Sequence, residues 1–256
     1  ESMIKAFFTH SIENDTVFEI DLTPNRIDAA SHYGVARDLA AYLNQEKPTI
    51  AALPTLETLP LDEKIDPVEV KIENNKACLR YAGICMTGIT IAESPQWLKN
   101  RLLSIGLHPI NNIVDITNFV LHETGQPLHA FDIDKLQGKK ILVKNVEKDT
   151  QFTTLDEGVR TLAEDDLMIC DEKGPVALAG VMGGLDSGIS DKTARLFIES
   201  AYFVPTGIRR TAKRLGLSTD SSFRFERGVD PNGILYALKR CALMIRSIAN
   251  GKIASN

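Results

Sequence analysis

Alternating apolar and polar residues predict that the middle of the chain consists of short β-strands. Segments 68–74 and 77–91 alternate in this way, and we expect both to be antiparallel strands. Another short strand is expected at 17–22, where Phe18, Ile20 and Leu22 alternate with acidic residues. The remaining strands are expected at 141–146, 152–155, 159–162, 167–170, 176–181 and 195–201.

Apolar residues at helical spacing predict helices around these strands. One helix is expected after Ser31, a residue type that caps helix N-termini, and it should end before Pro48. Others are expected between Ser94 and Gly106, at 112–124, at 205–215, and between Pro231 and Ala249. Because the strands are grouped and the helices are segregated from them, the pattern favours an α+β fold with mixed or antiparallel sheets.

The chain divides into three parts by composition. Between Gln45 and Pro67, prolines and acidic residues dominate and apolar periodicity is weak, which is typical of a linker. We therefore expect a small N-terminal α/β fragment at 1–48, a linker at 49–66 and the main domain at 67–256.

The overall composition is that of a globular protein. The 256 residues are 43% hydrophobic and 25% charged, which excludes a disordered, fibrous or small disulfide-stapled chain. No apolar run approaches the roughly 20 residues of a membrane-spanning helix, and no secretory signal is evident. We therefore expect no membrane association and a cytoplasmic location.

The charge is distributed unevenly along the chain. Residues 1–200 hold 19 basic and 31 acidic residues, whereas residues 201–256 hold 10 and 3. A basic C-terminal quarter on an acidic body is compatible with a local phosphate-facing surface, and equally with a solvated helix face.

Cysteines and histidines offer no recognisable metal site. The four cysteines lie far apart without a C-x-x-C pair, so buried free thiols are expected. Gly125 and Pro127 interrupt the stretch between His122 and His129, so these histidines do not share one helix face.

A glycine cluster at 180–188 follows an apolar strand. It lacks the Lys-Ser/Thr pair of a phosphate-binding loop, which argues against nucleotide hydrolysis. Glycines at such a place either bring backbone N–H groups against a ligand or form a tight turn that packs against a neighbour.

Two further positions carry polar chemistry in unusual surroundings. The stretch 115–132 contains Thr117, Asn118 and His129, a concentration of hydrogen-bonding groups around one imidazole. Glu199 lies inside the apolar strand LFIESAYF, where a buried carboxylate needs a partner. Either its side chain points outward or it is a buried acceptor for a ligand.

Basic residues form a broad face on the predicted helix at 205–215. Arg209 and Lys213 are four residues apart, as are Arg210 and Arg214. This face could contact phosphates, pair with acidic residues of the chain, or form a subunit interface.

Together these segments resemble the β subunit of bacterial phenylalanyl-tRNA synthetase, in that family's order. The matching stretches are LTPNRIDAASHYGVARDLAAYL (22–43), INNIVDITNFVLHETGQPLHAFD (110–132), TLDEGVRTL (154–162), ALAGVMGG (177–184) and TAKRLGLSTDSSFRFERGVDP (211–231). The resemblance implies a fragment of a larger subunit that contains the editing module, which hydrolyses mischarged tRNA.

The resemblance also implies roles for individual residues. Glu199 would accept the hydroxyl of a tyrosine wrongly attached to tRNA(Phe). Catalytic positions would be Thr117, Asn118 and His129; Ala179 and Gly180 would form the pocket wall and Ser221 its edge. Apart from the resemblance, the Gly183–Gly184 turn is a candidate source of backbone N–H donors to an oxyanion. Arg209, Arg210, Lys213 and Arg214 are candidate tRNA contacts.

The family context implies partners and cofactors outside this chain. The whole synthetase is a ligase of protein biosynthesis, an α2β2 heterotetramer that binds tRNA(Phe) and uses ATP and magnesium on its α subunit. No cofactor or metal is expected within the fragment, which should not charge tRNA. The alternative function is a non-catalytic scaffold for tRNA docking or for contact between subunits.

Overall fold

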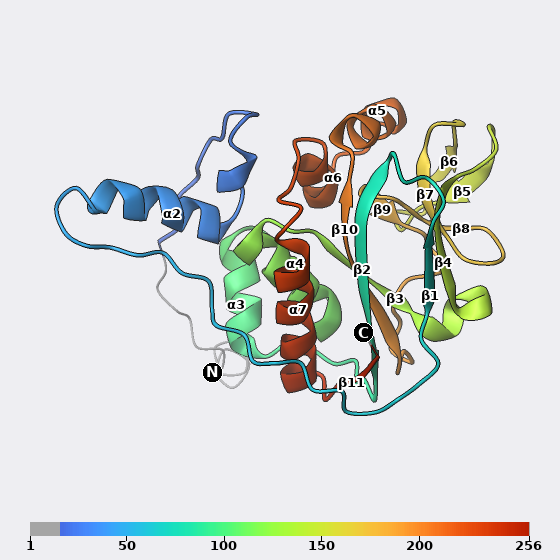
Figure 1. Cartoon of the computed structure of the whole chain (residues 1–256), viewed down its shortest axis with the longest axis horizontal. Helices are drawn as coiled ribbons and strands as arrows, with labels where there is room; N and C mark the ends of the chain where they lie inside the picture. Colours follow the sequence, from blue (N-terminus) through green and yellow to red (C-terminus); the bar gives the residue numbers. More distant parts are fainter. Residues whose placement is uncertain (1–15, 256) are drawn as a thin grey trace, which may run out of the picture.

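Two β-sheets face each other, and helices cover the outer face of one of them (Figure 1). The structure, a computed structural model, describes residues 16–255. One apolar core lies between the two sheets, and a second lies between the four-stranded sheet and its helices. The architecture confirms the predicted α+β class with mixed and antiparallel sheets.

The four-stranded sheet is antiparallel in the order β11-β2-β10-β3. Its strands are β2 (Cys78–Thr87), β3 (Leu128–Asp132), β10 (Leu196–Phe203) and β11 (Lys252–Ser255). Strand β10 has a partner on each side and apolar layers on both faces, which explains its nearly continuous apolar sequence. Its even-numbered Leu196 and Ile198 face the helices, whereas Phe197, Ala201 and Phe203 face the other sheet.

The second sheet has five strands in the order β1-β4-β7-β8-β9. These are β1 (Glu69–Ile72), β4 (Lys140–Asn145), β7 (Leu167–Cys170), β8 (Pro175–Leu178) and β9 (Met182–Gly183). Strand β1 runs parallel to β4, so the antiparallel pairing expected of segment 68–74 is wrong, whereas that of β2 is confirmed. A separate hairpin joins β5 (Gln151–Thr153) to β6 (Val159–Thr161).

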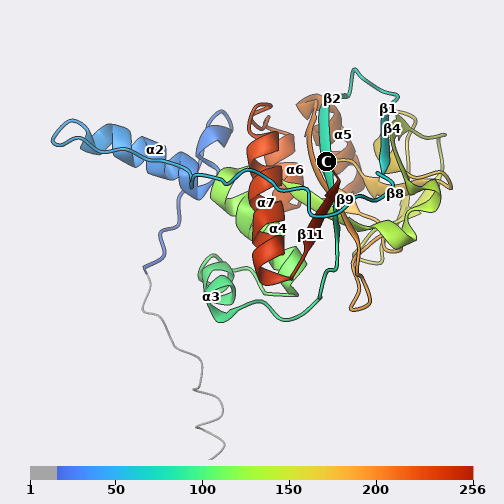
Figure 2. The same cartoon turned by 60° about the horizontal axis from the view of Figure 1, so that its bottom comes forward.

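Helices α3 (Gln96–Ser104), α4 (Asn112–Thr124) and α7 (Ile234–Ile248) cover the four-stranded sheet (Figure 2). Asn111 caps the start of α4 by accepting from two backbone N–H groups, and Gly125 ends it in the left-handed region. Helices α5 (Pro205–Leu215) and α6 (Asp220–Phe225) follow β10 and lie at one end of the sheets. Short 3-10 turns lie at Ile133–Lys135 and Gln137–Lys139.

The described N-terminal segment contains a 3-10 turn (Ile27–Ala29) and helix α2 (His32–Leu43), which projects from the body (Figure 1). Ser31 caps α2 as expected, since its hydroxyl accepts from Gly34 N. Residues 17–22 are not a strand, and Phe18 and Ile20 are exposed. Alternation alone was misleading there, because no strand within residues 16–255 pairs with this segment.

Residues 48–68 contain no helix or strand, but they are attached to the body. Tyr236 on α7 donates to Pro54 O at 2.7 Å, and Asp62 N donates to Ile253 O at 2.8 Å. The domain boundaries at 48 and 66 stay a prediction, and residues 1–15 of the expected N-terminal fragment lie outside the described residues.

Candidate functional site

A pocket lies where the two sheets meet helix α6. Strand β3 contributes His129, β10 contributes Glu199, and α6 contributes Ser221 and Phe225. The remaining lining comes from Pro127, Leu128, Ile169 and residues 177–183. Six of the residues singled out in the sequence therefore share one pocket: His129, Ala179, Gly180, Gly183, Glu199 and Ser221.

Glu199 is the buried carboxylate of this pocket, with 7% of its surface exposed. Its odd-numbered position on β10 places it on the face that looks toward the second sheet, so the outward orientation considered from the sequence is excluded. Tyr81 on β2 donates its hydroxyl to Glu199 Oε2 at 2.5 Å. Burial raises the pKa of Glu199 to about 7, although the Tyr81 hydrogen bond works in the opposite direction.

His129 lies directly opposite Glu199 in the antiparallel pairing of β3 with β10. Burial lowers the pKa of His129 to about 4, so its imidazole is neutral near pH 7. The ring packs edge-on against Phe131 at 4.4 Å between centroids, and among the described residues Nε2 has no hydrogen-bond partner. A buried neutral imidazole with one unpaired nitrogen suits a group that binds water or substrate.

The glycine turn brings its backbone close to buried rings. A Cβ at Gly183 would lie 2.7 Å from His129 Cε1, so only glycine leaves room for the imidazole. Gly180 has φ +67°, and a Cβ there would lie 3.0 Å from carbon atoms of Phe203 and Phe225. The turn therefore packs tightly against neighbouring rings and also lines the pocket, so the two alternatives considered from the sequence do not exclude each other.

Gly184 differs from the two preceding glycines. Its N–H donates to Val176 O at 2.9 Å, and the residue does not line the pocket. The role of Gly184 as an oxyanion donor stays a prediction that this geometry does not support, because its amide already donates to Val176 O.

Thr117 and Asn118 are not among the residues that line this pocket. Both lie on α4, which packs on the opposite face of the four-stranded sheet from Glu199. The Thr117 hydroxyl donates to Val114 O at 2.8 Å within the helix. Their catalytic role stays a prediction that pocket geometry does not support.

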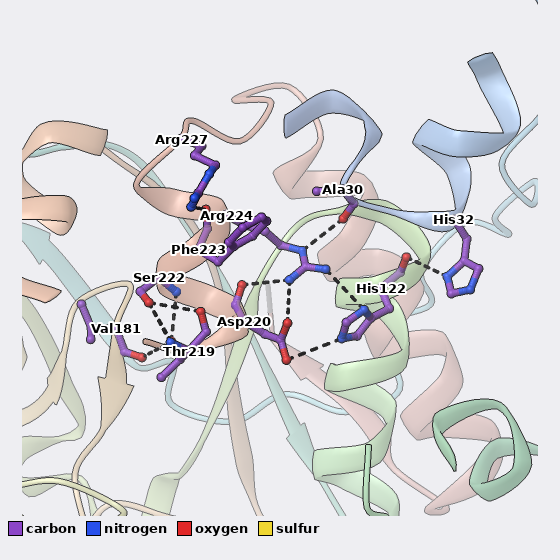
Figure 3. A network of polar contacts seen from close by, with 10 residues as sticks. All are labelled: Ala30, His32, His122, Val181, Thr219, Asp220, Ser222, Phe223, Arg224 and Arg227. Atoms are coloured by element: carbon purple, nitrogen blue, oxygen red, sulfur yellow. Dashed lines mark hydrogen bonds and ion pairs between the residues drawn. The ribbon is translucent and has the colours of Figure 1, made fainter. Parts of the chain in front are cut away.

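Helix α6 is tied to the glycine turn through its N-terminus (Figure 3). Thr219 and Ser222 form a capping box, and the Thr219 hydroxyl also lies 2.8 Å from Val181 O, to which it donates. This contact fixes the position of Ser221, the next-but-one residue, at the edge of the pocket. Helix α6 was not expected from the sequence, although Thr219 is a residue type that caps helix N-termini.

Arg224 connects α6 to the N-terminal segment and to α4 (Figure 3). Its buried guanidinium donates to Ala30 O at 3.2 Å and to Asp220 Oδ1 at 3.0 Å, and it lies 3.3 Å from His122 Nδ1. The His122 hydrogen bond and the nearby positive charges lower the pKa of Asp220 to about 2. His32 Nδ1 lies 3.0 Å from His122 O, which adds a second link between the body and the N-terminal segment.

The basic face of α5 is partly used within the chain. Arg210 pairs with Asp165 at 2.8 Å, and Arg214 pairs with the buried Asp166. Arg209 and Lys213 are exposed. Intrachain pairing, one of the alternatives left open by the sequence, therefore accounts for half of this face.

Further predicted features can be checked across the part of the chain that the structure describes. All four cysteines are buried free thiols, as expected. Residues 16–255 contain no group of three or more His, Cys, Asp or Glu side chains that could hold a metal ion. No helix in this range is long and apolar enough to cross a membrane.

Comparison with known proteins identifies the class. A sequence profile described as the B3/4 domain matches residues 77–250, and the chain belongs to this family. It is 52% identical over 96% of its length to the phenylalanine–tRNA ligase β subunit of Bacteroides thetaiotaomicron, and 54% identical over 95% to that of Porphyromonas gingivalis. The resemblance inferred from the sequence is confirmed, and the chain spans about 30% of these relatives.

A solved structure supports the same fold. An N-terminal fragment of the phenylalanyl-tRNA synthetase β subunit from Pyrococcus horikoshii matches with a TM-score of 0.50. The match covers 90% of this chain and 60% of that fragment at 17% identity, so it concerns the fold alone.

Proposed function

We propose that the pocket around Glu199 and His129 hydrolyses tyrosyl-tRNA(Phe), as the editing site of a phenylalanyl-tRNA synthetase. The observation that carries the proposal is a buried carboxylate next to a buried neutral imidazole in one pocket. Burial costs both groups their hydration, and a bound ligand that offers hydrogen bonds would offset that cost.

The chemical need for such a site follows from the difference between tyrosine and phenylalanine. An apolar pocket rejects an added hydroxyl by only about 10²-fold, whereas a site that hydrogen-bonds a hydroxyl rejects its absence by about 10⁴-fold or more. A carboxylate is a strong acceptor because its hydrogen bond is charge-assisted. Phenylalanine in this pocket would leave Glu199 without the phenol, and would therefore bind weakly.

The proposed reaction is direct attack of water on the ester carbonyl. His129 Nε2 would bind the water, the ester bond would break, and the ribose oxygen of the terminal adenosine would take up a proton. A covalent enzyme intermediate is not required. Burial raises the pKa of Cys78 to about 12, and among the described residues His129 Nε2 accepts no hydrogen bond from Ser221, so neither is an activated nucleophile.

The wider context is part of the proposal, since the chain spans about 30% of its curated relatives. The complete protein would act in the cytoplasm with an α subunit in an α2β2 assembly, and would bind tRNA(Phe). ATP and magnesium would serve aminoacylation outside this chain, and no step of the proposed hydrolysis depends on them.

A non-catalytic scaffold is the second candidate. It is favoured by Thr117 and Asn118, which lie outside the pocket lining. Under this alternative, the fold would serve tRNA docking or subunit contact, and the buried carboxylate would only be part of the core.

Deacylation assays separate the two functions. We expect the intact synthetase to release tyrosine from Tyr-tRNA(Phe) but not phenylalanine from Phe-tRNA(Phe), and Glu199→Gln to reduce this selectivity by about tenfold to a hundredfold, the range expected for one hydrogen bond to a charged group. His129→Ala should slow release of tyrosine. Glu147→Gln, at an exposed position, is the matched control. Unchanged selectivity in Glu199→Gln would favour the scaffold.

A further inference from the structure

The carboxylate in the pocket already accepts one phenolic hydroxyl from the protein itself. Tyr81 lies on β2 at the position paired with Ala201, two residues along from the Gly83–Glu199 pair. Diagonal neighbours on one face of an antiparallel pair are within reach of long side chains. Because Gly83 has no side chain, the Phe197 ring can pack directly over it; a Cβ at Gly83 would lie only 2.0 Å from that ring.

The two sides of the carboxylate have different surroundings. Glu199 lines the pocket, whereas Tyr81 does not. Tyr81 is half-buried and donates to Oε2 at 2.5 Å. Among the described residues no donor bonds to Oε1, so one oxygen is held by the protein and the other is left for a ligand.

We propose that Tyr81 is a positioning residue for specificity, which holds the Glu199 carboxylate in place and ionised so that its other oxygen accepts the phenol of a bound tyrosyl group. This inference rests on the proposed function. In this arrangement the Tyr81 phenol binds the carboxylate oxygen Oε2 from outside the pocket, and it does not compete with the ligand for the other oxygen.

The groups around Glu199 explain why a neutral donor is needed. On the same face, β2 also presents Cys78, and β3 presents His129. Burial keeps both uncharged near pH 7, since the pKa of Cys78 is raised to about 12 and that of His129 is lowered to about 4. Helix α7 packs on the opposite face of the sheet. No cation in this set balances the carboxylate, which leaves the Tyr81 hydrogen bond to stabilise it.

The direction of the effect follows from this hydrogen bond. A hydrogen bond to the ionised form favours that form, so Tyr81 lowers the pKa of Glu199 while burial raises it to about 7. Loss of the Tyr81 hydroxyl should therefore raise that pKa further. Less of the carboxylate would then be ionised at pH 7, and the phenol would lose its charged acceptor.

The decisive variant is Tyr81→Phe, which removes one oxygen and keeps the ring. Tyr202→Phe is the matched control, because Tyr202 is also half-buried, lies on β10, and has no hydrogen bond to Glu199. We expect the pH midpoint for selective release of tyrosine from Tyr-tRNA(Phe) to rise by about one unit in Tyr81→Phe, with selectivity at pH 7 falling about fivefold. In a Glu199→Gln background, Tyr81→Phe should change neither quantity.

A direct titration keeps this inference separate from the proposed function. Carbon-13 NMR of the glutamate side-chain carboxyls in the purified chain should show one midpoint near 7, absent in Glu199→Gln and shifted upward in Tyr81→Phe. An unshifted midpoint, or a rise in tyrosyl selectivity in Tyr81→Phe, would overturn the role of Tyr81. If the Glu199 midpoint shifts in Tyr81→Phe but the wild-type synthetase does not release tyrosine selectively, the editing function and the specificity role of Tyr81 are both refuted. Only the stabilisation of the Glu199 carboxylate by Tyr81 would then remain.

Discussion

Replacement of Arg224 by methionine should detach the N-terminal segment from the body and destabilise the chain. The Arg224 side chain is 6% exposed, and its guanidinium bonds to Ala30 O, to Asp220 and to His122. Methionine has a similar length and fills the site with apolar atoms, so the loss is mainly of hydrogen bonds and charge. The contact between His32 and His122 O would still link the N-terminal segment to the body.

The expected magnitude can be built from the partners left behind. Ala30 is 7% exposed, so its carbonyl would lose its donor while buried, at a cost of about 1–3 kcal/mol. Asp220 is 49% exposed and can turn to water, which limits its share to about 1 kcal/mol. Together these losses predict a decrease of about 2–4 kcal/mol in the free energy of unfolding.

Urea unfolding monitored by circular dichroism measures this quantity, and hydrogen exchange of α2 reports the detachment. Arg227→Met is the matched control, because Arg227 lies over the Phe223 ring at 3.9 Å and pairs with Glu226 at the surface of the same segment. The control should cost at most about 1 kcal/mol. If both variants unfold at the same urea concentration, or if α2 exchanges at the wild-type rate in Arg224→Met, the anchoring role is refuted.

Four further outcomes are expected. The pKa of Asp220 is lowered from 3.8 to about 2, so the stabilisation from its carboxylate is present above pH 3.8 and is lost as the pH falls through 2. Asp220→Asn should therefore be less stable than wild type by about 1 kcal/mol at pH 7, after solvent screening. The difference in urea midpoint between the two proteins should shrink toward pH 3. A difference in urea midpoint that does not change with pH would contradict this role of the Asp220 carboxylate. Gly180→Trp should lower the melting temperature as well as the activity, because a Cβ at this position would point at Phe203 and Phe225. A loss of activity in this variant would therefore not show by itself that the substrate pocket has been filled. Ser221→Trp, from the half-buried pocket edge, should stop tyrosyl release with little change in melting temperature, and retained activity would place the substrate elsewhere. Gly183→Ala should displace the His129 ring, and a changed NMR signal of the imidazole would report this. An unchanged signal would show that the backbone of the turn moves and the ring does not.

Local signals in the sequence predicted much of the fold. The ends of α4 and α5 follow from Gly125 and Gly216, which adopt the left-handed conformation that ends a helix. Short apolar runs located β7 and β10, and the carboxylate of Glu199 inside an apolar strand marked the site before any geometry was known. These features depend on residues close together in the chain, so periodicity and capping are enough to read them.

Tertiary structure alone decided which of these residues meet. Pairing of β3 with β10 sets His129 opposite Glu199, and pairing of β2 with β10 brings Tyr81 to the same carboxylate across 118 positions in the chain. The same sheet separates Asn118 from that pocket, although Asn118 is close to His129 in sequence. Strand register and the choice of sheet face arise from the packing of distant apolar surfaces, and no local pattern encodes which strand becomes the neighbour.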